Sequence, residues 1–288
     1  MDLKKLIEAK KVLIFDGALG TELAKRGLET SGALSLTNPE VIFDFHREYA
    51  AAGVDVLSTN TFIMNRISVE SHGLDIDLRE ANLAGVRLAR EAAGAKRLVF
   101  GDLGPTGKLL EPYGTFSEEQ FYEAFKEQAL MLAEGGVDGL IVETMTDLRE
   151  AVCALQACKD VTSLPVIVTM AFATMDKGGR TVMGNTAAEI ATALEQHGAD
   201  AIGANCGELT PEEMAQIGVF YRAHTNLPLL IQPNAGRPKL VAGKTVYDMV
   251  PEDYAEGVIK CIEKGASLVG GCCGTTIEHI KAVVRRLR

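Results

Sequence analysis

The segment Gly265–Cys273, GASLVGGCC in one-letter code, begins with a helix-to-strand connection of a kind that recurs along this chain. A glycine just past a helical stretch is a usual helix stop, and here it leads into a short apolar run that ends in glycines and two cysteines. A similar connection occurs at Gly53–Asp55, Gly136–Asp138 and Gly198–Asp200. In each of these, glycine is followed by a small or β-branched residue and then by aspartate. The chain is therefore built from repeated helix-to-strand units.

Eight short runs along the chain are predicted strands. Most are nearly all apolar, as expected of strands that are buried on both faces. They are Val12–Phe15, Val54–Ser58, Leu98–Gly101, Gly139–Val142, Val166–Met170, Ala201–Ala204, Leu229–Gln232 and Leu268–Gly271.

A helical stretch follows each predicted strand. The clear ones are Pro39–Ala52, Leu78–Ala93, Glu118–Glu134, Asp147–Lys159, Ala187–His197, Pro211–His224 and Pro251–Lys264. Eight strand–helix units of similar length predict an α/β protein with a closed (β/α)8 TIM barrel, and an open doubly wound sheet is the alternative. The sequence contains no evident linker, so we expect residues 1–288 to form a single barrel domain.

The composition narrows the class of partner. The 288 residues are 47% hydrophobic and 24% charged, which is ordinary for a soluble globular protein. The net charge of −10 argues against a nucleic-acid partner. The first apolar run is stopped by Asp16 and is too short for a signal peptide or a membrane span. We therefore expect a cytoplasmic protein without a membrane association, in which six cysteines favour metal binding or catalysis over disulfides.

Three cysteines are predicted to meet at one rim of the barrel. Cys272 and Cys273 follow the last strand, and their flanking glycines permit the break in alternation that lets neighbouring thiols converge. Cys206 follows the sixth strand, beside Gly207. Three thiolates at one level predict a zinc site with one open position, as catalytic zinc sites have. The alternative, buried cysteines that act as small hydrophobes, fits their positions at strand ends less well.

The remaining cysteines and the histidines are not predicted to bind metal. Cys153, Cys158 and Cys261 lie in helical stretches, and His46, His197 and His224 are predicted on helix surfaces. Three thiolates make zinc a poor Lewis acid toward water, so hydrolysis is disfavoured. A sulfur-rich zinc is better suited to bind a substrate thiol, whose ordinary pKa of roughly 8.5 leaves it mostly protonated at neutral pH. Alkyl transfer to that thiol is the predicted chemistry.

Polar residues at the other strand ends suit an amino-acid substrate. Asp16 and Glu143 are predicted to hold its ammonium group, and backbone N–H groups near Gly17 and Ala18 its carboxylate. The alternative for each carboxylate is a helix cap or an ion pair at the rim. The strand-end candidates are Asp16, Gly17, Ala18, Asn60, Glu143 and Asn234, with Asp102 better explained by the alternative.

These residues resemble the homocysteine S-methyltransferase family, and within it the homocysteine-binding module of cobalamin-dependent methionine synthase. The matching stretches span nearly the whole chain, and the last of them, together with Cys206, is the most specific. They are Asp16–Glu22, Ser58–Phe62, Gly104–Gly107, Glu143–Thr144, Gly203–Cys206, Pro233–Gly236 and Gly270–Thr276.

The resemblance implies a function and a set of roles. Cys206, Cys272 and Cys273 would bind zinc, and the homocysteine sulfur would take the fourth position. Asp16 and Glu143 would lie near the substrate's amino group, and Asn234 would offer its side-chain oxygen to zinc when substrate is absent. The product would be methionine, and the methyl donor methylcobalamin on a corrinoid protein or module.

Two other functions fit the same residues. One is a methyltransferase that takes the methyl group from a small sulfonium such as S-methylmethionine. The other is a non-catalytic barrel that binds zinc or thiols. A metal-free aldolase-like barrel would need a strand-end lysine, and none is present. Because the chain ends at Arg288, without the C-terminal extension of betaine-using relatives, we expect a stand-alone enzyme or one module of a longer protein.

Overall fold

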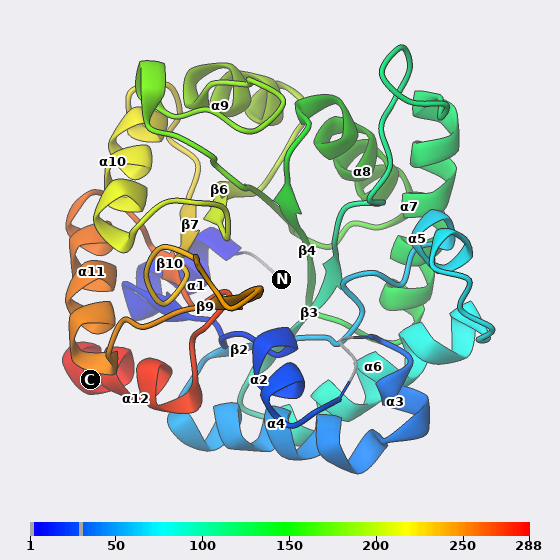
Figure 1. Ribbon diagram of the computed structural model, residues 1–288, viewed down its shortest axis with the longest axis horizontal. Coiled ribbons are helices and arrows are strands. Elements are labelled where there is room, and N and C mark those ends of the chain that lie inside the picture. Colours follow the sequence, from blue (N-terminus) through cyan, green and yellow to red (C-terminus); the bar gives the residue numbers. More distant parts are fainter. Residues whose placement is uncertain (1–2, 29–30) are drawn as a thin grey trace.

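The computed structural model describes residues 3–28 and 31–288, and its centre is one sheet of eight parallel strands (Figure 1). The strand order is β1-β10-β7-β6-β5-β4-β3-β2. The strands are β1 (Leu13–Ile14), β2 (Val56–Ser58), β3 (Leu98–Leu103), β4 (Gly139–Met145), β5 (Val166–Met170), β6 (Ala201–Asn205), β7 (Leu229–Gln232) and β10 (Leu268–Val269).

Backbone contacts between β1 and β2 close this sheet into a barrel. Phe15 pairs with Val56 in a parallel bridge. The Asp16 N–H donates to the Val56 carbonyl at 3.2 Å, and the Asp55 N–H donates to the Ile14 carbonyl at 2.7 Å. The predicted (β/α)8 TIM barrel is therefore confirmed.

Helices cover the barrel, most of them as an outer ring, with α1 and α2 inside that ring in this view (Figure 1). They are α1 (Leu3–Lys10), α2 (Gly20–Lys25), α3 (Leu34–Thr37), α4 (Pro39–Ala52), α5 (Arg66–Ser71), α6 (Leu78–Ala93), α7 (Glu118–Glu134), α8 (Leu148–Val161), α9 (Ala187–Gln196), α10 (Pro211–Arg222), α11 (Pro251–Glu263) and α12 (Ile277–Leu287). Ser117, Thr186 and Thr210 begin α7, α9 and α10 with capping boxes, which satisfy the first free N–H groups of a helix. Within the described residues, no helix is both long enough and apolar enough to cross a membrane.

The barrel interior is apolar near its amino-terminal end and polar near its carboxy-terminal end. Phe100, Ile141 and Leu230 belong to a buried interior cluster that Leu3 of α1 also joins. Because side chains two residues apart on a strand share a face, Asp102, Glu143 and Gln232 form the next layer. That layer is the floor of the site described below.

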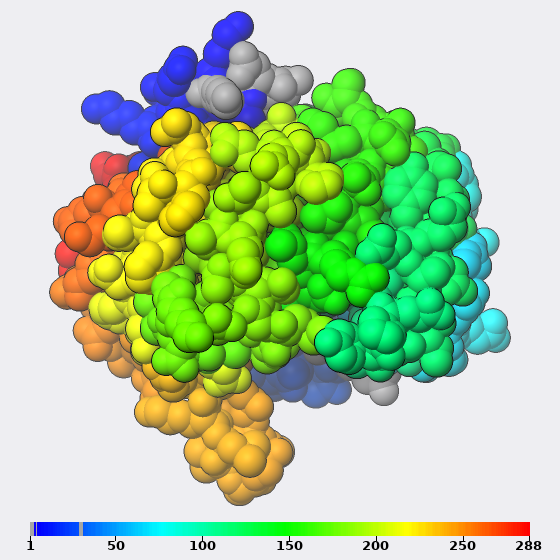
Figure 2. All heavy atoms as spheres, turned by 90° about the horizontal axis from the view of Figure 1, so that it is seen from above, coloured from blue at the N-terminus to red at the C-terminus, as the bar shows by residue number. Residues whose placement is uncertain are grey.

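The structure differs from the sequence prediction in several places. Strand β3 extends past Gly101 to Leu103, and β4 extends to Met145 with a register shift after Val142. Asp102 and Glu143 are therefore strand residues. Helix α1 and an antiparallel hairpin of β8 (Lys239–Val241) and β9 (Lys244–Val246) were not predicted. The hairpin projects from the end opposite α1 (Figure 2).

The predicted surface position of His46 is wrong. Its side chain is 2% exposed, because it lies on the face of α4 that packs against the barrel rather than on the solvent face. Burial lowers the pKa of His46 to about 4, so its ring is neutral at physiological pH.

Glu150 on α8 is a buried carboxyl group outside the barrel interior. It accepts hydrogen bonds from the Thr106 N–H and hydroxyl, both at 2.7 Å, and so anchors the loop that follows β3. Burial raises the pKa of Glu150 to about 7 from 4.5, despite these hydrogen bonds. Between pH 4.5 and about pH 7, Glu150 is therefore protonated in the folded state and ionised in the unfolded state.

This shift predicts a pH-dependent effect of Glu150→Gln on stability. The contribution of the protonated carboxyl group is fully present below pH 4.5 and is lost as the pH rises through 7. A glutamine still accepts from Thr106 but cannot ionise. Relative to the unaltered protein, we expect the variant to gain about 2–3 kcal/mol between pH 4.5 and pH 8. Urea denaturation at the two pH values measures this gain, and a pH-independent difference would contradict it.

Candidate metal and substrate site

The structure brings the three predicted cysteines together at the carboxy-terminal rim. Cys206 follows β6, and Cys272 and Cys273 follow β10. Their sulfur atoms all lie within 4.8 Å of one another, and the Cys206 and Cys273 sulfurs are 3.8 Å apart. The other three cysteines are free and buried in helices.

Local backbone conformation makes this convergence possible. Cys206 has a φ of +56°, and Gly207 and Gly274 have φ values of +70° and +80°. A side chain at position 207 would meet the Phe172 carbonyl oxygen at 2.3 Å from its Cβ, so only glycine fits there. The Cys272 N–H donates to the Pro233 carbonyl, and the Cys273 carbonyl accepts from the Ala235 N–H. The loops after β7 and β10 are therefore tied together at the cluster.

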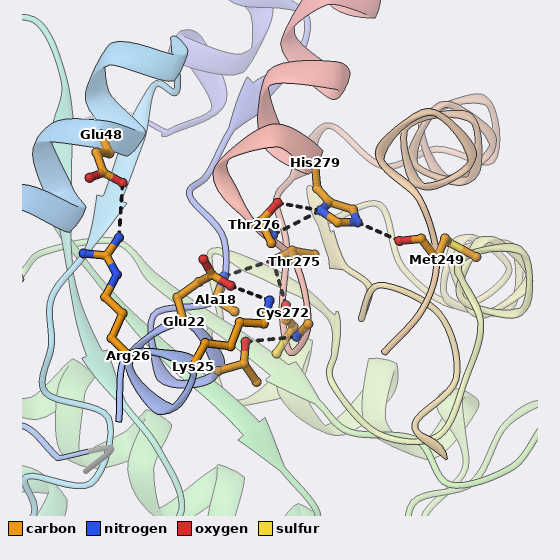
Figure 3. A network of polar contacts seen from close by, with 12 residues as sticks. Ala18, Glu22, Lys25, Arg26, Glu48, Met249, Cys272, Thr275, Thr276 and His279 are labelled. Atoms are coloured by element: carbon orange, nitrogen blue, oxygen red, sulfur yellow. Dashed lines mark hydrogen bonds and ion pairs between the residues drawn. The ribbon is translucent and has the colours of Figure 1, made fainter. Parts of the chain in front are cut away.

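Thr275 connects the cysteine loop to the first unit of the barrel (Figure 3). Its hydroxyl donates to the Cys272 carbonyl at 2.7 Å and accepts from the Ala18 N–H at 3.0 Å. Gly17 leaves room for this contact, because a Cβ there would lie 2.8 Å from the Thr275 Oγ. In this conformation the Ala18 N–H, which we predicted to hold a substrate carboxylate, is already engaged.

His279 anchors the segment that follows the hairpin (Figure 3). Its Nδ1 accepts from the Thr276 N–H at 3.1 Å, and its Nε2 lies 2.9 Å from the Met249 carbonyl oxygen, to which it donates. Tyr247, two residues before Met249, packs on Gly274, where an added Cβ would come within 2.3 Å of the tyrosine side chain. Sequence reasoning missed both residues, since their contacts join segments that are about 30 positions apart.

The cysteines open on a cavity of about 310 Å³, which we call the rim cavity. It contains three carboxyl groups, and no lysine or arginine lines it among the described residues. Its lining comprises Asp16, Gly17, Ala18, Leu19, Gly20, Thr21, His46, Tyr49, Ser58, Thr59, Asn60, Phe62, Asp102, Glu143, Thr144, Cys206, Gln232, Gly271, Cys272 and Cys273. A cavity with this lining favours a ligand that carries a cationic group.

Burial strongly affects the two predicted ammonium-binding residues. Asp16 accepts hydrogen bonds from the Ser58 N–H at 2.8 Å and the Ser58 hydroxyl at 3.0 Å. Burial nevertheless raises the pKa of Asp16 to about 7. Burial, followed by the charges of Asp16 and Cys273, raises the pKa of Glu143 to about 8. A cation placed between them would favour the ionised form of both.

The sulfur geometry fits a tetrahedral metal ion. Two thiolates at the usual zinc–sulfur distance of about 2.3 Å lie about 3.8 Å apart in a tetrahedron, which agrees with the Cys206–Cys273 separation of 3.8 Å. Hydrogen bonds from Cys206 and Cys272 lower the pKa of Cys273 to about 3, while those from Cys206 and Cys273 raise the pKa of Cys272. The cluster thus favours one shared thiolate, and a soft cation is needed to ionise the rest.

A protein-family model described as homocysteine S-methyltransferase matches residues 13–287. The chain belongs to the homocysteine S-methyltransferase family.

Two methionine synthases are similar to this member of the homocysteine S-methyltransferase family. Those of Mycobacterium tuberculosis and Mycobacterium leprae are each 34% identical over 296 residues, which cover 96% of this chain and 24% of the relative. The chain thus spans about a quarter of their length. Among solved structures, the homocysteine methyltransferase MmuM from Escherichia coli, metallated form, has a TM-score of 0.82 and 24% identity, with 99% of this chain and 100% of that chain covered. That likeness shows the fold.

Asn205 is a further residue that organises the site in this family member. Its Oδ1 accepts from the Thr144 N–H and the Thr169 hydroxyl, and its Nδ2 donates to the Thr144 hydroxyl and to Glu143 Oε2 at 3.2 Å. Asn205 therefore fixes the position of Glu143. Its place immediately before Cys206 was the one sequence signal for this role.

The two remaining predicted residues differ in their surroundings. Asn60 lines the rim cavity, but its amide donates to the Ser31 carbonyl and the Ser35 hydroxyl, so it holds a neighbouring loop. Asn234 is fully buried; its Nδ2 donates to the Gly207 carbonyl at 2.9 Å, and its Oδ1 has no hydrogen-bond partner among the described residues. A buried oxygen without a partner next to the cysteine loops is consistent with a metal ligand.

Proposed function

We propose that this chain transfers a methyl group to the thiol of homocysteine, giving methionine, and that residues 1–288 act as one homocysteine-binding barrel domain. The observation that carries this proposal is the meeting of three thiols and three carboxyl groups in one cavity. Membership of the homocysteine S-methyltransferase family supports it. Because the chain spans about a quarter of the methionine synthases it matches, the activity of those whole proteins is part of the proposal.

Zinc is the proposed cofactor, with Cys206, Cys272 and Cys273 as its ligands. When bound, zinc would supply the positive charge that ionises a substrate thiol near neutral pH. Asn234 is the proposed additional ligand when no substrate is present, because its Oδ1 is buried without a partner. A structure of the metal-loaded protein without homocysteine tests this assignment, and an Asn234 side chain far from the metal would refute it.

The chain's own residues would orient the substrate. Asp16 and Glu143 would accept hydrogen bonds from its ammonium group, with Asp16 held by Ser58 and Glu143 by Asn205. The Gly17 N–H is the proposed donor to the substrate carboxylate. The sulfur, having lost its proton, attacks the methyl carbon. The sulfur–carbon bond forms while the bond from that carbon to the donor breaks, and the donor keeps the electron pair.

A methylated corrinoid protein is the proposed methyl donor. The similarity to methionine synthases supports it, as does the surface around the rim cavity. Several large apolar side chains on the loops after β3, β5 and β7 are exposed, namely Leu109, Tyr113, Val182, Leu240 and Val241. On these loops they offer apolar contacts to a protein that docks over the rim. Because the site needs reduced thiols, we also propose a cytoplasmic location.

The rival donor is a small sulfonium such as S-methylmethionine. The observation that favours it is the anionic lining of the rim cavity, which suits a small cation. Structural likeness to MmuM agrees with a shared fold but does not bear on the donor.

Donor assays with zinc-loaded protein and homocysteine separate these possibilities. We expect methionine to form with methylcobalamin and not with S-methylmethionine. Turnover with S-methylmethionine alone would overturn the corrinoid assignment and leave homocysteine methylation in place. Failure with both donors, although zinc and homocysteine bind, would favour a non-catalytic thiol-binding barrel.

A further inference from the structure

Asp102 is a buried carboxyl group of the rim cavity that no role described above uses. It lies on β3 and is 6% exposed. Neither a helix cap nor a salt bridge involves it in the described part of the chain, so the alternative that we preferred from the sequence is wrong. Its Oδ1 is buried and has no hydrogen-bond partner among the described residues, which is rare for a polar atom in a protein interior.

Neighbouring residues hold the backbone of Asp102 and leave its carboxyl group free. The Asp102 N–H donates to the Thr59 hydroxyl at 3.0 Å, and its carbonyl accepts from the Thr61 hydroxyl at 2.7 Å. The two threonine hydroxyls lie 2.6 Å apart, and Gln128 of α7 donates to the carbonyl of Thr61. The carboxyl group is thus aimed at the cavity by residues that do not satisfy it.

The groups that face Asp102 in the cavity are acidic. Burial raises the pKa of Asp102 well above its ordinary value, and the charges of Glu143 and Asp16 raise it further. The other titratable groups of the lining, His46, Tyr49 and the cysteines, supply no cation, because the imidazole is neutral. Three carboxyl groups in one cavity repel one another unless protons or a cation are shared among them.

A primary ammonium group matches this arrangement. It carries one positive charge and three N–H donors, and three carboxyl groups line the cavity. We infer that Asp102 is a specificity-determining residue whose carboxylate is the third acceptor, with Asp16 and Glu143, for the ammonium group of the amino-acid substrate. This inference rests on the proposed function and extends it, since the site would then select a free α-amino group.

The test is a comparison of binding by two ligands to zinc-loaded protein, measured by isothermal titration calorimetry. The ligands are L-homocysteine and 4-sulfanylbutanoate, which lacks the amino group and keeps the thiol and the carboxylate. The variant is Asp102→Asn, which keeps the shape and removes the charge. Asp102→Ser serves as a second variant in case the first does not fold. Glu150→Gln is the matched control, because it also neutralises a buried carboxyl group but lies outside the cavity.

We expect Asp102→Asn to weaken homocysteine binding at least about tenfold and to leave 4-sulfanylbutanoate binding unchanged within about twofold. Glu150→Gln should change neither affinity. An equal loss for both ligands, or no loss for either, would overturn the inference. No loss for either ligand is the result expected if Asp102 were a protonated hydrogen-bond donor, because the asparagine amide of the variant donates as well. If the unaltered protein does not bind homocysteine, the proposed function itself fails, and the two failures are thereby distinguished.

Discussion

The unaltered protein is expected to contain about one zinc per chain, and the Cys206→Ser variant, prepared without added metal, almost none. Cys206 is the one thiol of the cluster that comes from β6, and its sulfur lies 3.8 Å from that of Cys273. Loss of a metal ligand should weaken zinc binding by more than the 10- to 100-fold that is typical when a residue hydrogen-bonded to a ligand is replaced. Methyl transfer to homocysteine should fall in proportion to the zinc content.

Elemental analysis of both proteins measures this, and Cys153→Ser is the matched control. Cys153 is a free thiol on α8, outside the rim cavity, so its variant should keep the full zinc content. A Cys206→Ser protein that still binds one zinc per chain with undiminished affinity would exclude Cys206 as a ligand. An unaltered protein that takes up no zinc even when it is supplied would remove the proposed mechanism.

The second large effect is expected from Glu143→Gln. Neutralising one partner of a buried, hydrogen-bonded charge pair typically costs 2–5 kcal/mol, so the KM for homocysteine should rise by about 100-fold. In the proposed mechanism the ammonium group would be bound equally in the ground state and the transition state, and kcat should therefore change much less. Zinc content should stay at the level of the unaltered protein, since Glu143 is not a proposed metal ligand.

Steady-state kinetics with varied homocysteine gives the two constants separately. Glu150→Gln again provides the comparison, because burial raises the pKa of both glutamates. A fall in kcat with an unchanged KM would contradict ammonium binding and would instead place Glu143 in the transfer step. Loss of zinc in Glu143→Gln would show that the residue supports the metal site.

The barrel and the cysteine cluster were predictable because their signals are local. Each strand is a short apolar run, and each of Cys206, Cys272 and Cys273 stands beside a glycine at a strand end. In a barrel of parallel strands, the ends of all strands reach one rim. The resemblance to the homocysteine S-methyltransferase family came from the same positions, and the family match confirmed it.

The parts that were not predicted depend on contacts between distant segments. The strand end at Gly101 was placed too early, because a charged residue such as Asp102 is an unusual member of a buried strand. Asn205 acquires its role from Glu143 and Thr144, which lie on another strand. The burial of His46 follows from how α4 packs on the barrel, and a single polar residue does not reveal that. No local pattern contains these relations.

The polar layer of the cavity, above the apolar barrel interior, has a consequence for how selection for thermal stability would act on this protein. Asp16 and Asp102 are buried and Glu143 is partly buried beside them, without a basic partner among the described residues, and such groups lower the stability of a fold. In the proposed function, their presence is a trade-off in which folding free energy is given up for recognition. Selection for thermal resistance alone would replace them with apolar residues. A substrate that neutralises these carboxyl groups binds only the folded state and so raises the free energy of unfolding. Stability in the cell will therefore depend on the concentration of that substrate.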